Sequence, residues 1–324
     1  MKHLDFDDVL IMPGESEKPL TRGIIDITPN GYVPIIVSNM VSTGTFEVSK
    51  IASEHGFLTF LSKEYTAEEY LKHLDQIDSQ FVGITSGVRD FDHEKLLKIL
   101  KVNNKFGYLN IDIANVGANV DGMIQTIELY KDNFEGKVVA GNVATIDLAY
   151  KLASAGADII KVGIGSGAAC TTRSEVGVGV PQYQAIKDIT NELSVPIISD
   201  GGCVNSGDVC KAIAAGAEFV MLGGMFSSCK ELAKHGEDYV DFFGLGSKKM
   251  YDTYTPIDYE YRPVEGRTLK VPVKNSIVDV FNQLKGALRS VCTYVGVDNI
   301  HDLSSKTKFI QVNHQYNRSL QKYE

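Results

Sequence analysis

The stretch DIIKVGIGSGAACTTRSEVGVGVPQ, residues 158–182, decides the fold prediction. An apolar run over residues 158–162 leads into a loop with five glycines, two threonines and one cysteine, and a helical pattern begins at Pro181. Glycine is favoured where the backbone turns with positive φ or approaches a ligand closely. Cys170 in such a loop is a candidate nucleophile, because a thiolate attacks electron-poor carbon readily. The alternative is an ordinary surface turn around a small buried side chain.

The same strand-then-helix unit recurs along the chain. Runs of Val, Ile, Leu and Phe without strict alternation suit strands that are covered on both faces, as in a parallel sheet. Such runs predict eight strands, at 33–37, 57–61, 81–85, 106–111, 137–140, 158–162, 195–199 and 219–222. Helices are predicted at 45–55, 67–76, 91–101, 120–130, 146–155, 181–192, 206–215 and 276–297. This α/β series predicts a (β/α)8 TIM barrel, with a doubly wound open sheet as the competing fold.

In such a barrel, functional residues lie where strands end and helices begin. The predicted strand ends hold residues that packing does not require: Ser38, Asn39, Met40, Lys63, Ser86, Gly87, Asp112, Asn115, Gly141, Asn142, Asp200, Gly201, Gly202, Gly223 and Gly224. The glycine pairs at 201–202 and 223–224 follow the seventh and eighth strands, where barrels commonly bind phosphate through backbone amides. For either pair alone, a tight strand-to-helix turn is the alternative interpretation.

Residues 241–273 interrupt the alternation after the eighth strand. The segment is rich in glycine, tyrosine and charge, and its length predicts an active-site flap within the barrel domain. Glu265, in the run RPVEGR at residues 262–267, could serve as an acid or a base. A solvated loop with surface ion pairs is the alternative.

Composition excludes several classes of function. The formal net charge of −9 argues against a nucleic-acid or anionic-membrane surface, although a small phosphorylated ligand remains compatible with it. No apolar run reaches the roughly 18 to 20 residues of a membrane helix, and the acidic amino-terminal stretch is unlike a signal peptide, so we expect a cytoplasmic protein. The five cysteines are widely spaced without a C-x-x-C pair, which argues against a disulfide framework or a zinc site. All except Cys170 are expected to be inert.

Five segments together resemble one known family. They are FDDVLIMPGES (6–16), KVGIGSGAACTTR (161–173), SDGGCVNSGDVCKAIAAGAEFVMLGGM (199–225), YRPVEGRT (261–268) and LKGALRSVCTYVG (284–296). The chain resembles the IMP dehydrogenase and GMP reductase family over nearly its whole length. The resemblance implies a single catalytic domain over residues 1–324, without the inserted CBS modules of many family dehydrogenases. The flap lacks the Arg-Tyr pair of the dehydrogenases and is similar to the reductase pattern.

The resemblance also implies a reaction. GMP and NADPH would give IMP, ammonia and NADP⁺ through a covalent bond between Cys170 and carbon 2 of the purine. Thr172 and Glu265 match the family's pair that protonates the leaving ammonia. Three alternatives stay open: an IMP dehydrogenase, a reductase of a deoxy or modified guanine nucleotide, and a non-catalytic nucleotide-binding scaffold.

Binding residues follow from the same resemblance. For the nucleotide substrate they are Asp200 for the ribose, Gly201, Gly202, Gly223 and Gly224 for the phosphate, and Gly244, Leu245, Gly246, Ser247 and Arg262 for the base and its flap. For the cofactor they are Lys63, Ser86, Asp112, Ala114 and Asn115. The carbonyls of Gly165, Gly167 and Cys170 would hold a monovalent cation such as K⁺, and the family's barrels are usually homotetramers. Ala168 departs from the family pattern, since a serine that helps to bind phosphate is usual there.

Overall fold

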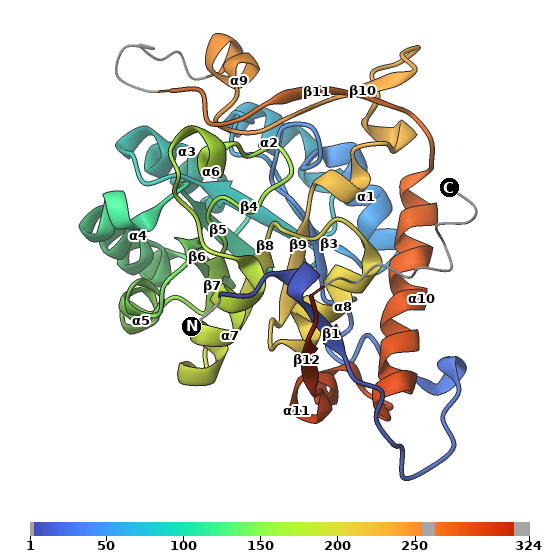
Figure 1. The fold of residues 1–324 in the computed structure, drawn as a ribbon. Helices are drawn as coiled ribbons and strands as arrows, with labels where there is room; N and C mark the ends of the chain where they lie inside the picture. Colours follow the sequence, from blue (N-terminus) through green and yellow to red (C-terminus); the bar gives the residue numbers. More distant parts are fainter. Residues whose placement is uncertain (1–2, 255–262, 314–324) are drawn as a thin grey trace.

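Eight parallel strands close into a barrel, which confirms the predicted (β/α)8 fold (Figure 1). The structure is a computed structural model that describes residues 3–254 and 263–313. Each barrel strand pairs with the next along the chain, and the last pairs back with the first. The barrel strands are β2 (Ile35–Val37), β3 (Leu58–Phe60), β4 (Val82–Ser86), β5 (Tyr108–Asp112), β6 (Lys137–Val143), β7 (Ile159–Val162), β8 (Ile197–Asp200) and β9 (Phe219–Leu222). Each of the eight strands overlaps the apolar run that predicted it.

The described residues form the eight helices that the strand-helix alternation predicts around the barrel, and three short helices of four to six residues that were not predicted. They are α1 (Phe46–Glu54), α2 (Ala67–His73), α3 (Asp90–Leu100), α4 (Val120–Asn133), α5 (Ile146–Ser154), α6 (Thr172–Glu175), α7 (Gln182–Glu192), α8 (Ser206–Ala214), α9 (Lys248–Thr253), α10 (Ile277–Val295) and α11 (Leu303–Lys306). Short 3-10 turns lie at η1 (Phe6–Asp8), η2 (Arg22–Ile24), η3 (Leu74–Gln76), η4 (Val116–Ala118), η5 (Gly224–Phe226), η6 (Lys230–Leu232) and η7 (Ile300–Asp302). Among the described residues, no helix has the length and hydropathy to cross a membrane.

Local sequence signals set the helix ends. Thr66 caps α2 through a capping box with Glu69, and Ser276 caps α10 in the same way with Asp279. These pairs satisfy backbone N–H groups that have no partner within the helix. The predicted helix at 276–297 is confirmed as α10. Its residue Phe281 stacks on Phe57, with ring centroids 4.0 Å apart, and so packs the helix onto the barrel.

Side chains on the barrel strands alternate between two buried clusters. The interior of the barrel is lined by Ile36, Leu58, Phe60, Tyr108, Val139, Ile159, Ile198, Phe219 and Met221. The neighbouring residues on the same strands, such as Ile160 and Val162 on β7, belong to the cluster between strands and helices. Because strand side chains point alternately to the two faces, Lys161 must lie on the interior side with Ile159. The same alternation places Asp112 with Tyr108, and Asp200 with Ile198.

Two small antiparallel sheets were not predicted. β10 (Tyr239–Phe243) and β11 (Thr268–Pro272) form a hairpin that carries α9 and runs over the barrel end where α2, α3 and α6 begin in Figure 1. β11, α9 and the end of β10 lie within residues 241–273, the segment predicted as a flap. The second sheet pairs β1 (Val9–Ile11) with β12 (Phe309–Gln311), so that the two ends of the described chain meet beside α8. β1 and β12 are mostly exposed or half-buried, so they lack the continuous apolar run that marks the barrel strands.

Candidate active site at the mouth of the barrel

The loop after β7 carries Cys170 to the centre of the site. Gly165 has φ +78°, a conformation that other residues rarely adopt, and so it allows the chain to turn back after the strand. The backbone N–H of Cys170 donates a 3.0 Å hydrogen bond to the carbonyl oxygen of Gly167, which closes a tight turn. The Cys170 side chain is left half-buried at the rim of the barrel.

Cys170 begins a short chain of polar side chains. Its Sγ lies 3.2 Å from Oγ1 of Thr172, and that hydroxyl donates a 2.8 Å hydrogen bond to Oε2 of Glu265. A thiol, a hydroxyl and a carboxylate in this order can transfer a proton between the carboxylate and a group bound near the sulfur. The three residues predicted to be catalytic are therefore brought together in the structure.

The flap ribbon docks directly on this loop. Gly266 forms isolated bridges with both Cys170 and Ser247. The N–H of Thr171 donates to the carbonyl of Glu265 at 2.9 Å, and the N–H of Glu265 donates to the carbonyl of Gly246 at 3.1 Å. Backbone bonds thus fix Glu265 from two sides.

Arg267 fastens the same ribbon to the tip of the loop. Its guanidinium donates two hydrogen bonds to the carbonyl oxygen of Ala168, from Nε at 3.0 Å and from Nη2 at 2.8 Å. Its backbone N–H donates to the carbonyl of Ala169 at 3.0 Å. The planar, five-donor guanidinium of arginine suits such a paired contact better than lysine does.

The amino-terminal segment holds the other end of the loop. Oδ1 of Asp5 accepts a 3.1 Å hydrogen bond from the N–H of Gln182, at the start of α7. Oδ2 of Asp5 lies 3.4 Å from Nη1 of Arg173. The loop is therefore held both by the amino-terminal segment and by the segment that contains Glu265 and Arg267.

The predicted phosphate residues lie around the loop tip. A Cβ atom at Gly201 would stand 2.7 Å from Oγ of Ser166, and one at Gly224 would stand 2.9 Å from Cβ of Ala168. The loops after β7, β8 and β9 therefore approach each other so closely that a side chain at Gly201 or Gly224 would collide with the loop after β7. The N–H of Gly202 already donates to the carbonyl of Ser166 at 2.9 Å, whereas Gly223 lies against Met40 and Ser38.

The predicted base-binding segment lies against the loop that carries Cys170. A Cβ atom at Gly244 would stand 2.9 Å from the carbonyl oxygen of Ala169, so this segment touches the Cys170 loop. Leu245 and Gly246 are half-buried, and Ser247 is buried and caps α9 through Met250. Arg262 lies outside the described residues.

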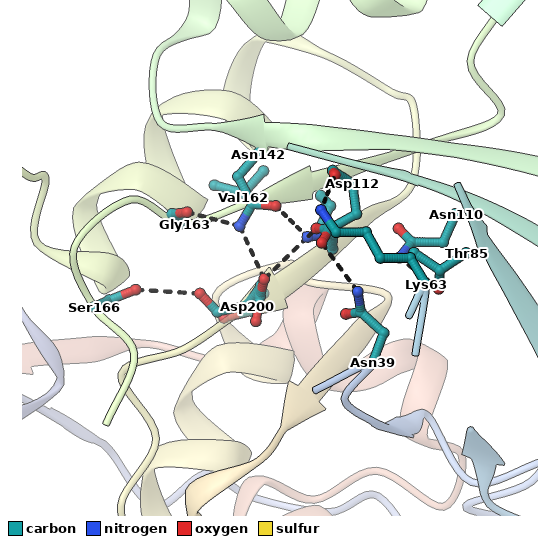
Figure 2. A network of polar contacts seen from close by, with 12 residues as sticks. Asn39, Lys63, Thr85, Asn110, Asp112, Asn142, Val162, Gly163, Ser166 and Asp200 are labelled. Carbon is teal, nitrogen blue, oxygen red and sulfur yellow. Dashed lines mark hydrogen bonds and ion pairs between the residues drawn. The ribbon is translucent and has the colours of Figure 1, made fainter. Parts of the chain in front are cut away.

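A charged cluster occupies the top of the barrel interior (Figure 2). The Lys161 ammonium contacts Asp112 from β5, Asn142 from β6 and Asp200 from β8, with Asp200 Oδ2 at 3.2 Å. Burial alone would raise the pKa of Asp112, but the charges of Lys161 and Lys63 outweigh it and lower that pKa to about 2. Burial alone would lower the pKa of Lys161, but the charges of Asp112 and Asp200 raise it.

Amide side chains complete this cluster. Nδ2 of Asn142 donates to Oδ2 of Asp200 and to the carbonyl of Gly163, both at 2.8 Å. Nδ2 of Asn39 donates to Oδ2 of Asp112 at 3.0 Å. From the sequence, the two asparagines are predicted only to lie at strand ends, and Lys161 only to lie within a strand. A lysine on the interior side of an apolar strand was the signal that could have identified it.

The predicted cofactor residues do not all reach the mouth. Nζ of Lys63 lies 3.4 Å from the carbonyl oxygen of Asp112 and so joins the charged cluster. Ala114 and Asn115 follow β5 and are exposed, with Asn115 capping η4. Ser86 is buried on the outer side of β4, where its hydroxyl bonds Tyr130 of α4 at 2.8 Å.

The carbonyls predicted to hold a cation lie in one loop, but one of them is engaged. The Gly167 oxygen accepts the turn bond from Cys170, and the oxygens of Gly165 and Cys170 flank it in sequence. Carbonyl oxygen is a suitable ligand for K⁺. Among residues 3–254 and 263–313, no group of three or more His, Cys, Asp and Glu side chains is arranged to hold a metal.

The remaining cysteines differ from Cys170. Cys210, Cys229 and Cys292 are buried, and burial raises the pKa of each thiol to about 12. Burial also raises the pKa of Cys203 well above the usual value. These thiols stay protonated at neutral pH, which agrees with the prediction that they are inert.

A closed barrel with a cysteine loop, a hydroxyl–carboxylate pair and a charged cluster at one end defines a (β/α)8-barrel enzyme. The family model of the IMP dehydrogenase / GMP reductase domain matches residues 3–319. The GMP reductase of Onchocerca volvulus is 36% identical over 345 aligned positions, which cover 99% of this chain and 94% of that protein. The GMP reductases of Vibrio vulnificus and Klebsiella pneumoniae are each 37% identical, over 97% of this chain and 96% of theirs. The chain belongs to the IMP dehydrogenase / GMP reductase family.

Proposed function

We propose that this enzyme is a GMP reductase that converts GMP to IMP and ammonia with NADPH as the reductant. The hydrogen-bonded chain from Cys170 through Thr172 to Glu265 carries the proposal, because it provides both a nucleophile and an acid for one carbon atom. The similarity to proteins named GMP reductase supports the same substrate.

The first half of the reaction exchanges nitrogen for sulfur. The Cys170 thiolate adds to carbon 2 of the purine, and the C2–S bond forms as the C2–N bond to the exocyclic amine breaks. An amine leaves as ammonia only after it gains a proton, and Thr172 is placed to pass one on from Glu265. The product of this half is a purine bound to Cys170 through sulfur.

The second half releases the purine. Bound NADPH supplies a hydride to carbon 2. The C2–S bond then breaks, and its electron pair returns to Cys170 as thiolate, which is ready for the next cycle. The balance is GMP, NADPH and one proton in, and IMP, ammonia and NADP⁺ out.

The rim residues suit the two ligands. The Asp200 carboxylate is partly exposed and would accept the ribose hydroxyls, while the glycine loops after β7, β8 and β9 would surround the phosphate. Lys63 offers a cation beside Asp112, and the exposed Ala114 and Asn115 follow on the same side, where the cofactor would lie. Ser86 would contribute indirectly, by holding the end of β4 against Tyr130.

Further parts of the proposal concern the whole protein. Residues 1–324 would form one catalytic domain, with residues 241–273 as a lid that moves to admit ligands. Four copies would assemble in the cytoplasm, and K⁺ on the loop carbonyls would stiffen the Cys170 loop. The family resemblance supports these expectations. Light scattering tests the assembly of four copies, and activity measured with and without K⁺ tests the cation site.

A direct assay tests the proposed reaction. Purified protein with GMP and NADPH should oxidise the cofactor and release ammonia in equal amounts, and Cys170→Ala should abolish both. NADH in place of NADPH tests the cofactor preference. Reduction of NAD⁺ with IMP would indicate an IMP dehydrogenase instead, and a preference for 2′-deoxy-GMP would indicate a reductase of a deoxynucleotide. Tight GMP binding without turnover on any cofactor would indicate a binding scaffold.

A further inference from the structure

The side chain of Lys161 occupies an unusual place for a charged group. It projects into the barrel above Ile159, and only 1% of it is exposed. Interiors of such barrels are normally filled by layers of branched apolar side chains. The lower layers here follow that rule with Ile36, Val139 and Ile198. The uppermost layer instead holds an ammonium group between two carboxylates.

Stability alone does not account for this arrangement. Removing two opposite charges from water costs several kcal/mol per ion, and apolar residues of similar volume often stabilise a core equally well or better. A lysine buried to this degree therefore indicates that its charge is needed to hold another group in position.

The contacts show what the position controls. Oδ2 of Asp200 accepts from Asn142 at 2.8 Å and from Lys161 at 3.2 Å. Oδ1 of Asp200 has no hydrogen-bond partner among the residues that the structure describes, and 26% of this side chain is exposed. The carboxylate is thus held through Oδ2, which contacts Asn142 and Lys161 (Figure 2), while Oδ1 is left to accept a hydrogen bond from a ligand.

We propose that Lys161 is a positioning residue that fixes the Asp200 carboxylate so that Oδ1 accepts a ribose hydroxyl. This inference rests on the proposed function, because it assumes a ribonucleotide at Asp200. The same ammonium holds Asp112, on the side expected to face the cofactor. Lys161 also lies on β7, nine positions before Cys170, and so the ribose anchor and the nucleophile extend from one strand.

The inference predicts a specific effect on selectivity for the 2′-hydroxyl. GMP and 2′-deoxy-GMP differ by one hydroxyl, and a hydrogen bond to a charged, fixed acceptor should favour GMP by roughly tenfold to a hundredfold in Kd. Lys161→Met keeps an unbranched side chain that is one atom shorter and removes the charge. The freed carboxylate can then rotate, and the preference should fall to about threefold or less.

Equilibrium binding without cofactor tests this directly. Calorimetry with each nucleotide is done on the wild type, Lys161→Met and the double variant Lys161→Met/Asp112→Asn. The double variant removes one positive and one negative charge together, so it remains informative if Lys161→Met fails to fold. Thr85→Val is the matched control, because it removes a buried polar contact with Asn110 in the same barrel interior without touching Asp200.

Loss of the GMP preference in the Lys161 variants, with an unchanged preference in Thr85→Val, is the expected result. An unchanged preference in the Lys161 variants, an equal loss in the control, or no preference in the wild type would each overturn the inference. Turnover of GMP distinguishes the two levels of proposal. An active wild type without ribose discrimination overturns only the role of Lys161, whereas a wild type that neither binds nor turns over GMP overturns both.

Discussion

Glu265 accepts a 2.8 Å hydrogen bond from the Thr172 hydroxyl, although 93 positions separate the two residues. Thr172 opens α6 directly after the cysteine loop, and Glu265 lies on the flap ribbon that folds back over it. The proposed acid, Glu265, therefore comes from a different segment of the chain than the proposed nucleophile, Cys170. Each of the two residues can therefore be substituted without changing the segment that carries the other.

Thr172→Val should abolish the relay while leaving the nucleotide site in place. Valine has the shape of threonine without the hydroxyl, so Cys170 and Glu265 lose the group that joins them. Loss of one general acid–base contribution should lower kcat by on the order of a hundredfold or more. Steady-state NADPH oxidation with GMP measures this effect.

Thr171→Val is the matched control for that substitution. Thr171 is the neighbouring threonine, and in the structure it contributes backbone bonds to Glu265 and Ser174 rather than a side-chain cap. Its kcat should stay within a few-fold of the wild type. Equal losses in the two variants would contradict a specific role for the Thr172 hydroxyl.

Chemical labelling should single out Cys170. Iodoacetamide reacts with thiolates, and burial raises the pKa of Cys210, Cys229 and Cys292 to about 12. At neutral pH we expect one adduct per chain by intact mass, its position at Cys170 by peptide mapping, and protection by GMP. The adduct should be missing in Cys170→Ala; labelling spread over several cysteines would show that the core thiols are more accessible than the structure indicates.

Arg267→Met should loosen the loop tip without unfolding the protein. The variant loses both bonds to the Ala168 carbonyl, but Arg267 is exposed and an exposed polar contact contributes little to stability. We expect a higher KM for GMP with a Tm close to that of the wild type. Arg267→Lys keeps the charge but not the paired geometry, and it should resemble Arg267→Met if geometry is what matters.

Asp112 should make the fold sensitive to acid. Its pKa is about 2 in the folded protein against 3.8 for the free group, so folding favours the ionised form. This stabilisation is fully present above the unfolded pKa and disappears as pH falls toward 2. The difference corresponds to about 2 kcal/mol. Asp112→Asn should lower the urea midpoint at neutral pH and flatten its decline between about pH 5 and pH 2.

Asp241→Asn is the control for the acid effect. Lys249 also lowers the pKa of Asp241 through a hydrogen bond, but this pair lies on the flap and is partly exposed. Its removal should change the acid limb much less. A similar flattening in both variants would show that buried location is not the cause.

The barrel could be predicted because its strands are buried on both faces. Apolar runs such as 35–37 and 219–222 stand out from the polar helices between them. The flap hairpin could not be predicted in this way. Thr268–Pro272 alternates exposed residues with the half-buried Leu269 and Val271, and two apolar residues are too short a pattern to predict a strand without its partner Tyr239–Phe243.

The site was predictable where a residue type is rare in its setting. A cysteine among glycines and a glutamate in a long insertion identified Cys170 and Glu265, and the family pattern added Thr172. Lys161 was missed because a single lysine inside an apolar run gives no clue to its partners. Those partners, Asp112 and Asp200, come from other strands and meet it only when the barrel closes. The contribution of Arg262 remains a prediction.

The hydrogen bonds of Asp5 with the cysteine loop have a consequence for the nascent chain. During synthesis Asp5 emerges first, the loop with Arg173 and Gln182 follows much later, and the ribbon with Glu265 comes later still. Domains generally fold as units, and this barrel closes only when β9 pairs with β2. The contacts of Asp5 with the loop therefore form late, together with the rest of the barrel. Catalytic competence arises abruptly near the end of translation, and incomplete chains should consume no nucleotide.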